Sequence, residues 1–104
     1  MTRDDILNMP AGREMNRLVM EWVTELTVDD NFYIPAYSTD IAAAWEVVAK
    51  MGNVNELHDV ELRTSIRGWI CNIFNSFDSF EVNAETAPLA ICRAALLTVM
   101  DGGQ

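Results

Sequence analysis

The sequence predicts an α+β fold with the element order helix, helix, strand, strand, strand, helix. Three observations predict it. Apolar residues recur at three- and four-residue steps up to Gly52, which is typical of helices, and at two-residue steps after it, which is typical of strands. The run that follows Thr86 is apolar on nearly every side of a helix. With 104 residues, we expect one domain spanning residues 1–104.

A short first turn of helix is expected at the N-terminus, followed by the first of the two main helices that precede the strands. Thr2 and Asp5 have the spacing of a capping box, so a short helix over Asp4 to Asn8 is predicted before Pro10. A longer amphipathic helix is predicted from about residue 12 to residue 26. Its apolar side consists of Met15, Leu18, Val19, Trp22, Val23 and Leu26.

Residues 27 to 38 show no sustained period and are predicted to form a loop that carries both acidic and aromatic residues. A second main helix is expected over residues 39 to 51, capped by Ser38 or Thr39, with Asp40 in its first turn and Gly52 at its end. Its predicted core stripe consists of Ile41, Ala44, Trp45, Val48 and Met51. We expect all three tryptophans, Trp22, Trp45 and Trp69, to fill the core.

Three strands are predicted after Gly52 from alternation of apolar and polar residues. The alternating apolar positions are Val60 and Leu62, then Trp69, Cys71 and Ile73, and then Phe80, Val82 and Ala84. Ile70 suggests that the middle strand is buried on both faces. Because the connections are short, we expect a three-stranded antiparallel meander.

The last helix is predicted over residues 87 to 100, with Thr86 as its cap and Pro88 in its first turn. Because it is apolar all round, we expect it to lie against the sheet and to be covered on its other side by a helix or a second subunit. Helices on one or on both faces of the sheet satisfy the strand patterns equally well.

Two runs resemble the phage ABA sandwich domain, a family of small bacteriophage and prophage proteins. They are Thr86-Ala87-Pro88-Leu89-Ala90-Ile91-Cys92-Arg93-Ala94-Ala95-Leu96 and Tyr37-Ser38-Thr39-Asp40-Ile41-Ala42-Ala43-Ala44-Trp45-Glu46-Val47-Val48, and Met9-Pro10-Ala11-Gly12 is similar to the same family. The resemblance implies a layered helix/sheet/helix sandwich and a phage or prophage origin. It implies no activity and no catalytic or ligand residues.

The chain is strongly acidic, with 16 Asp and Glu against 7 Lys and Arg and a net charge of −9. Between Leu18 and Leu62 nine acids stand against the single base Lys50. Direct binding to nucleic acid is disfavoured because phosphate contacts need clustered basic residues, and a basic protein partner is favoured. The alternative is that the charge serves solubility alone. We expect neither a membrane span nor an export signal, and therefore a location in the host bacterial cytosol.

Catalytic and metal-binding groups are sparse. His58 is the single histidine, and no second histidine or thiolate completes a metal set around it. Cys71 and Cys92 are expected to be reduced core thiols rather than nucleophiles. The sequence therefore predicts no enzyme, no cofactor and no metal site.

The predicted partner-binding residues lie in the acidic, tyrosine-bearing stretch before the second main helix and within that helix. They are Asp29, Asp30, Tyr33, Tyr37, Ser38, Thr39, Asp40 and Glu46. Together with the phage resemblance, they suggest an anti-defence or host-takeover inhibitor that occupies a basic, nucleic-acid-binding surface of a bacterial protein.

Two other functions remain open from sequence. One is an oligomeric module that sequesters a nucleotide signal, with phosphate held by Arg13, Arg17, Arg63, Arg67 or Arg93. The other is a phage accessory protein that acts by self-association, as a homodimer or a higher homo-oligomer.

Overall fold

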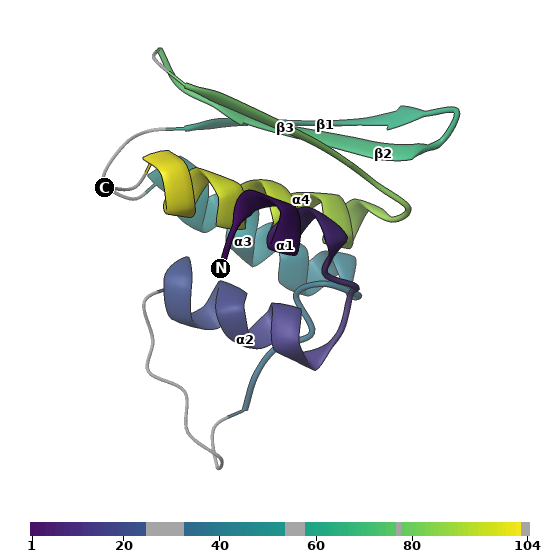
Figure 1. Ribbon diagram of the computed structural model, residues 1–104, viewed down its shortest axis with the longest axis vertical. Coiled ribbons are helices and arrows are strands. Elements are labelled where there is room, and N and C mark those ends of the chain that lie inside the picture. The colour runs from purple at the N-terminus through teal and green to yellow at the C-terminus, as the bar shows by residue number, and fades with distance from the viewer. Residues whose placement is uncertain (25–32, 54–57, 77, 103–104) are drawn as a thin grey trace.

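A three-stranded sheet and two layers of helices make up the computed structural model, which describes residues 1–24, 33–53, 58–76 and 78–102 (Figure 1). The elements are α1 (Arg3–Asn8), α2 (Arg13–Trp22), α3 (Ile41–Asn53), β1 (Asp59–Ser65), β2 (Gly68–Phe74), β3 (Ser79–Ala84) and α4 (Ala87–Leu97), with a π-helical turn over Thr98–Gly102. The predicted α+β class and the three-stranded antiparallel sheet are confirmed. Short α1 precedes the two longer N-terminal helices, as the capping box predicted.

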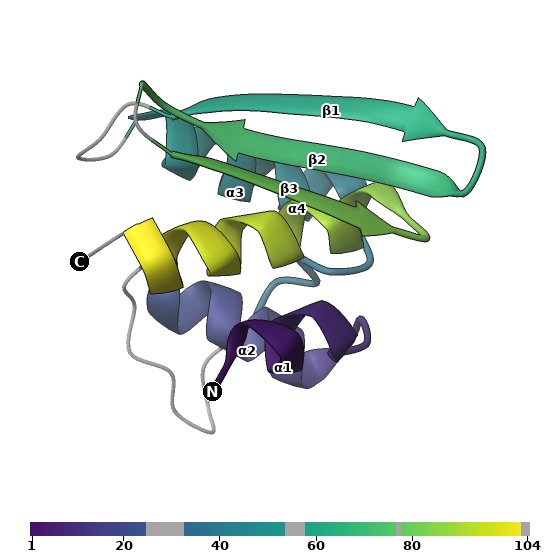
Figure 2. The same ribbon diagram turned by 45° about the horizontal axis from the view of Figure 1, so that its top comes forward.

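The layers follow one another from the sheet downward. The helices α3 and α4 pack directly against the sheet, and α1 and α2 pack against α4 (Figures 1 and 2). Among the described residues, both helix layers lie on the same side of the sheet. The strand patterns allowed helices on one face or on both faces of the sheet. The structure has them on one face, so the layers of the sandwich follow the order sheet, helix, helix.

The strands are arranged in the order β1-β2-β3, with antiparallel pairing throughout. Leu62 pairs with Cys71, which pairs with Val82, so this row of side chains faces the helices. Glu61 pairs with Asn72, which pairs with Glu81, and this row faces away from them. Ile70 belongs to the outward face and is half-buried, so the prediction that β2 is buried on both faces was wrong.

Gly68 begins β2 in a conformation that few other residues adopt, with φ of +134°. A Cβ atom at this position would collide with the carbonyl oxygen of Ala84 on β3. The turn between β1 and β2 therefore depends on glycine for both its backbone conformation and its close approach to β3.

The helix α4 is the centre of the core. Ten of its eleven residues are buried, and it contacts β2 and β3 on one side and α1, α2 and α3 on the others. The exception, Arg93, is half-buried, and its Nη2 donates a hydrogen bond to the carbonyl oxygen of Met9 at 2.8 Å. The predicted cover on both sides is confirmed, and helices of the same chain supply it.

The predicted helix starts are confirmed at two of three places. Thr2 and Asp5 form the capping box of α1, and Thr86 Oγ1 accepts the N–H of Leu89 at the start of α4. The third start differs: Asp40 caps α3, because its Oδ1 accepts the N–H of Ala42 at 3.0 Å. The predicted caps Ser38 and Thr39 lie before this point, and the role of Ser38 is described below.

Candidate partner-binding surfaces

The segment before α3 is fastened to the start of α2 by one buried side chain. Ser38 Oγ accepts the N–H of Gly12 at 2.9 Å and donates to Asn16 Oδ1 at 2.7 Å. The Ser38 N–H donates to the same Asn16 oxygen at 2.8 Å. Ser38 is therefore a structural tie between two segments that are far apart in the sequence, and it is not available to a partner.

Replacement of Ser38 by alanine is expected to destabilise the protein by about 2 kcal/mol, because the Gly12 N–H and Asn16 Oδ1 each lose a partner. Urea unfolding of Ser38→Ala measures this cost. Thr39→Ala is the matched control, since Thr39 is the adjacent residue and is exposed. Equal stability of the two variants would contradict the assigned role of Ser38.

Tyr37 is also buried, with 3% of its surface exposed. Burial raises the pKa of its phenol, and the carboxylate of Glu46 raises it further. Cys92 and Tyr33 act on this pKa in the same direction. The phenol of Tyr37 is neutral and belongs to the core, which removes it from the surface predicted for a partner.

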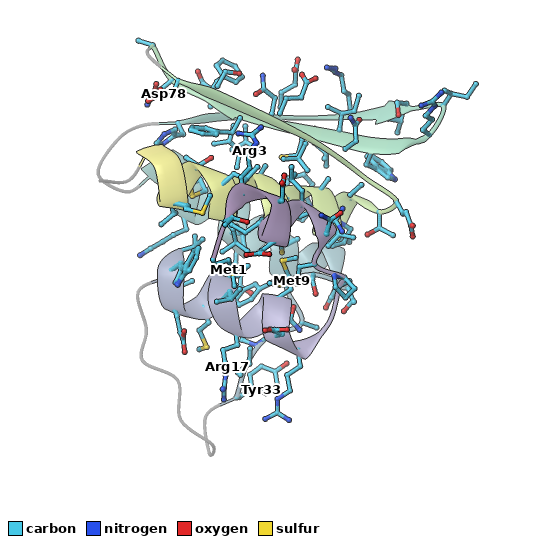
Figure 3. All side chains as sticks on the ribbon, viewed as in Figure 1. Met1, Arg3, Met9, Arg17, Tyr33 and Asp78 are labelled. Atoms are coloured by element: carbon cyan, nitrogen blue, oxygen red, sulfur yellow. The ribbon has the colours of Figure 1, made fainter. Side chains whose placement is uncertain are left out.

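The other predicted partner residues have different positions. Tyr33 is 78% exposed, and Thr39, Asp40 and Glu46 are exposed as well. In the view of Figure 3, Tyr33 lies at the α2 end of the molecule, as Arg17 does, and Asp78 lies at the opposite end, near the sheet. Asp29 and Asp30 lie outside the described residues.

The outer side of α3 is apolar and exposed, contrary to the sequence prediction. Ile41 and Trp45, which were expected in the core, have 41% and 50% of their surfaces exposed. Ala42 and Ala49 are exposed on the same side of the helix. The prediction is confirmed at Ala44 and Met51, which are buried in the core together with Ala43 and Val47. We call Ile41, Ala42, Trp45 and Ala49 the α3 apolar face.

The face of the sheet that points away from the helices forms a second surface, which we call the open sheet face. Asp59, Glu61 and Glu81 are exposed on it, and Ile70, Asn72 and Phe74 of the middle strand are half-buried. Arg63 is also on this face and forms an ion pair with Glu81, with 3.1 Å between Nη2 and Oε1. Ser79 donates to Asn72 Oδ1 across the strands.

Alternation in the sequence is enough to place two acids together on the open sheet face. Asp59 and Glu61 alternate with Val60 and Leu62, so the two acids had to share one face of the sheet. What alternation does not indicate is whether helices cover that face.

Comparisons with known proteins identify the family. Residues 12–96 match the phage ABA sandwich domain. The chain belongs to this family. A phage protein from Bacillus cereus ATCC 14579, known from a 2.0 Å crystal structure, is similar: its TM-score is 0.77, its identity is 29%, and the match covers 88% of this chain and 95% of that chain. No curated protein sequence matches the chain significantly.

The resemblance of the two sequence runs to the phage ABA sandwich domain is thereby confirmed, and the chain is a small phage-derived protein. Both runs now have a structural role. The run that begins at Thr86 forms the covered core helix, whereas the run that begins at Tyr37 forms the tie to α2 and the exposed side of α3.

Negative charge in this phage ABA sandwich domain is displayed on the surface. Every acid whose exposure the structure describes is exposed: Asp4, Asp5, Glu14, Glu21, Asp40, Glu46, Asp59, Glu61, Asp78, Glu81 and Glu85. The bases are less available, because Arg17, Lys50 and Arg93 are half-buried and Arg63 is paired with Glu81. The described surface therefore carries an excess of negative charge.

The titratable groups within the fold show no nucleophile poised to react. Burial raises the pKa of both thiols, Cys71 and Cys92, to about 12, so each is a neutral free thiol in the core. His58 is half-buried, and its Nε2 lies 3.2 Å from Asn75 Nδ2. Within the described ranges, no group of three or more His, Cys, Asp and Glu side chains is placed to hold a metal ion. No helix there is long and apolar enough to cross a bilayer.

Proposed function

We propose that this protein is a non-enzymatic inhibitor of a bacterial host protein, and that it acts by occupying a basic surface that normally binds nucleic acid. The observation that carries the proposal is the exposure of all eleven acids whose burial the structure describes. Clustered lysines and arginines that bind phosphates would be attracted to such a surface. An anti-defence or host-takeover role is consistent with the phage origin of the family.

The open sheet face offers the most regular arrangement of this charge. Alternate residues of a strand lie about 7 Å apart, which is the spacing of Asp59 and Glu61 along β1. Glu61 and Glu81 are two strands apart in one row, which corresponds to about 10 Å, and Glu81 is paired with Arg63 on the same face. Carboxylates held at fixed intervals on a rigid sheet are suited to a row of basic side chains, and they lose little entropy on binding.

Sequestration of a nucleotide is less well supported. It requires guanidinium groups that are free to bind phosphate, and two of the five arginines predicted for this role are already engaged: Arg63 is paired with Glu81, and Arg93 donates to the Met9 carbonyl oxygen. The exposed acids of the open sheet face would also repel phosphate.

The proposal is tested by an affinity pull-down from bacterial lysate, with the bound proteins washed at increasing salt. We expect a basic, nucleic-acid-binding protein that is retained at low salt and released when salt rises from about 0.05 M to about 0.5 M, because screening weakens charge attraction. Nucleic acid is expected to compete with the protein for this partner. Retention that does not depend on salt, or a partner that nucleic acid does not displace, would contradict the proposal.

Two matched variants locate the surface. Asp59→Asn/Glu61→Gln removes two carboxylates from the open sheet face, and Glu14→Gln/Glu21→Gln removes two exposed carboxylates from α2. The overall charge change is the same in both. We expect the first variant to weaken binding of the partner about tenfold or more and the second to weaken it less. Equal losses would show that net charge acts without a defined surface.

A further inference from the structure

The α3 apolar face exposes about half of the surface of its two large side chains, Ile41 and Trp45. The helix α3 packs against α4 and β1, and Ile41 and Trp45 are exposed on its other side. An exposed tryptophan and isoleucine one helical turn apart are unusual on an otherwise acidic surface. Aromatic side chains of this kind are typical anchors of protein interfaces.

We propose that this face binds a second copy of the same chain, so that two α3 helices pack antiparallel about a two-fold axis that crosses the helix at the height of residue 47. Such an axis places residues whose numbers add to about 94 opposite one another. Trp45 of each copy then lies over Ala49 of the other, where the small side chain leaves room for the indole. Because Trp45 and Ala49 both belong to the α3 apolar face, their contact forms twice across the axis, as a two-fold interface requires.

The charges beside the apolar face fit the same arrangement. Glu46 is exposed, and Lys50 is half-buried one turn further along α3. Glu46 and Lys50 are opposite each other for an axis at residue 48, which is one residue, or about 1.5 Å, from the axis that suits Trp45 and Ala49. Each copy therefore presents its glutamate to the other copy's lysine, and Lys50 is the single base between Leu18 and Leu62.

A second copy suits this face better than a basic host protein. The α3 apolar face contains no acid, and the adjacent Glu46 and Lys50 cancel, so the surface lacks the excess negative charge that a basic partner selects. The four side chains of the α3 apolar face lie on a 13-residue helix about 20 Å long, and they cover an area much smaller than the roughly 800 Å² per partner of a standard interface. We therefore expect a weak dimer, with a dissociation constant of about 10 µM to 1 mM.

Sedimentation velocity of the purified protein from about 5 µM to about 1 mM tests the proposal, at a salt concentration that screens the net charge of each copy. We expect a shift from monomer to dimer across this range. Trp45→Glu is expected to weaken dimerisation at least tenfold. Ile66→Glu is the matched control, because Ile66 is fully exposed in the β1–β2 turn, outside the α3 apolar face, and it should not change dimerisation.

Charge reversal tests the antiparallel arrangement. Glu46→Lys and Lys50→Glu are each expected to weaken the dimer, and the double variant Glu46→Lys/Lys50→Glu is expected to restore it. Circular dichroism confirms that each variant is folded. A monomer at every concentration overturns the proposal, as does a dimer that Trp45→Glu leaves unchanged.

The test is independent of the host partner because it uses purified protein alone. If the protein is monomeric and Trp45→Glu instead abolishes capture of the host protein, the α3 apolar face belongs to the host interface and the dimer is wrong. If the dimer forms and no host protein is captured, the proposed inhibition fails and the dimer stands.

Discussion

Gly68→Ala is expected to destabilise the protein by about 3 to 4 kcal/mol, a large part of the stability of a domain of this size. Two costs add at this position. A non-glycine residue at φ of +134° costs about 1 to 3 kcal/mol, and the new Cβ atom collides with the Ala84 carbonyl oxygen, which is fixed by the sheet. To relieve the collision, the start of β2 has to move away from β3. Urea unfolding followed by circular dichroism measures the loss.

Gly12→Ala separates the two costs. Gly12 also has a positive φ, of +151°, but a Cβ atom there would meet nothing within 4 Å. We therefore expect Gly12→Ala to cost about 1 to 2 kcal/mol, from backbone strain alone. If the two variants were equally stable, the close approach of Gly68 to Ala84 would have no energetic consequence, and the strand pairing at this end of the sheet would have to be looser than described.

These two glycines illustrate what sequence periodicity does and does not predict. The change of period after Gly52 predicted three strands, and the short connections predicted their antiparallel order. Neither signal depends on distant residues. The contact between Gly68 and Ala84 does, because it exists only once β3 has paired with β2.

The helices α3 and α4 also show which features the hydrophobic pattern of a sequence can predict. For α4, apolar residues on every side left no choice about burial, and the helix is the centre of the core. For α3, the expected burial is confirmed at Ala44 and Met51, but Ile41 and Trp45 are exposed, and the core-facing side of the helix is completed by Ala43 and Val47. When a helix offers two apolar sides, hydrophobic pattern cannot decide between them, and the shape of the neighbouring elements does.

Some of the predicted partner-binding residues are buried and others are exposed, and the sequence did not distinguish the two groups. Ser38 and Tyr37 have the polar atoms expected of a binding surface, yet both are buried, and Ser38 uses its polar atoms to join α2 to the start of α3. In the sequence, a serine that caps a helix cannot be distinguished from a buried serine that joins two segments. The acids were easier to place, because a carboxylate without a buried partner stays in water.

Ile91→Ala is expected to have the other large effect, a loss of about 3 to 4 kcal/mol, because Ile91 is fully buried in the middle of α4. The helix lies between the sheet and the other helices, so neither layer can move inward to fill the cavity without losing contact with the rest of α4. Ile66→Ala deletes the same atoms from a fully exposed isoleucine and should change stability by no more than about 0.5 kcal/mol. Thermal and urea unfolding of the pair measure the difference. A small loss for Ile91→Ala would mean that the layers around α4 can collapse into the space, which is incompatible with α4 as the rigid centre of the fold.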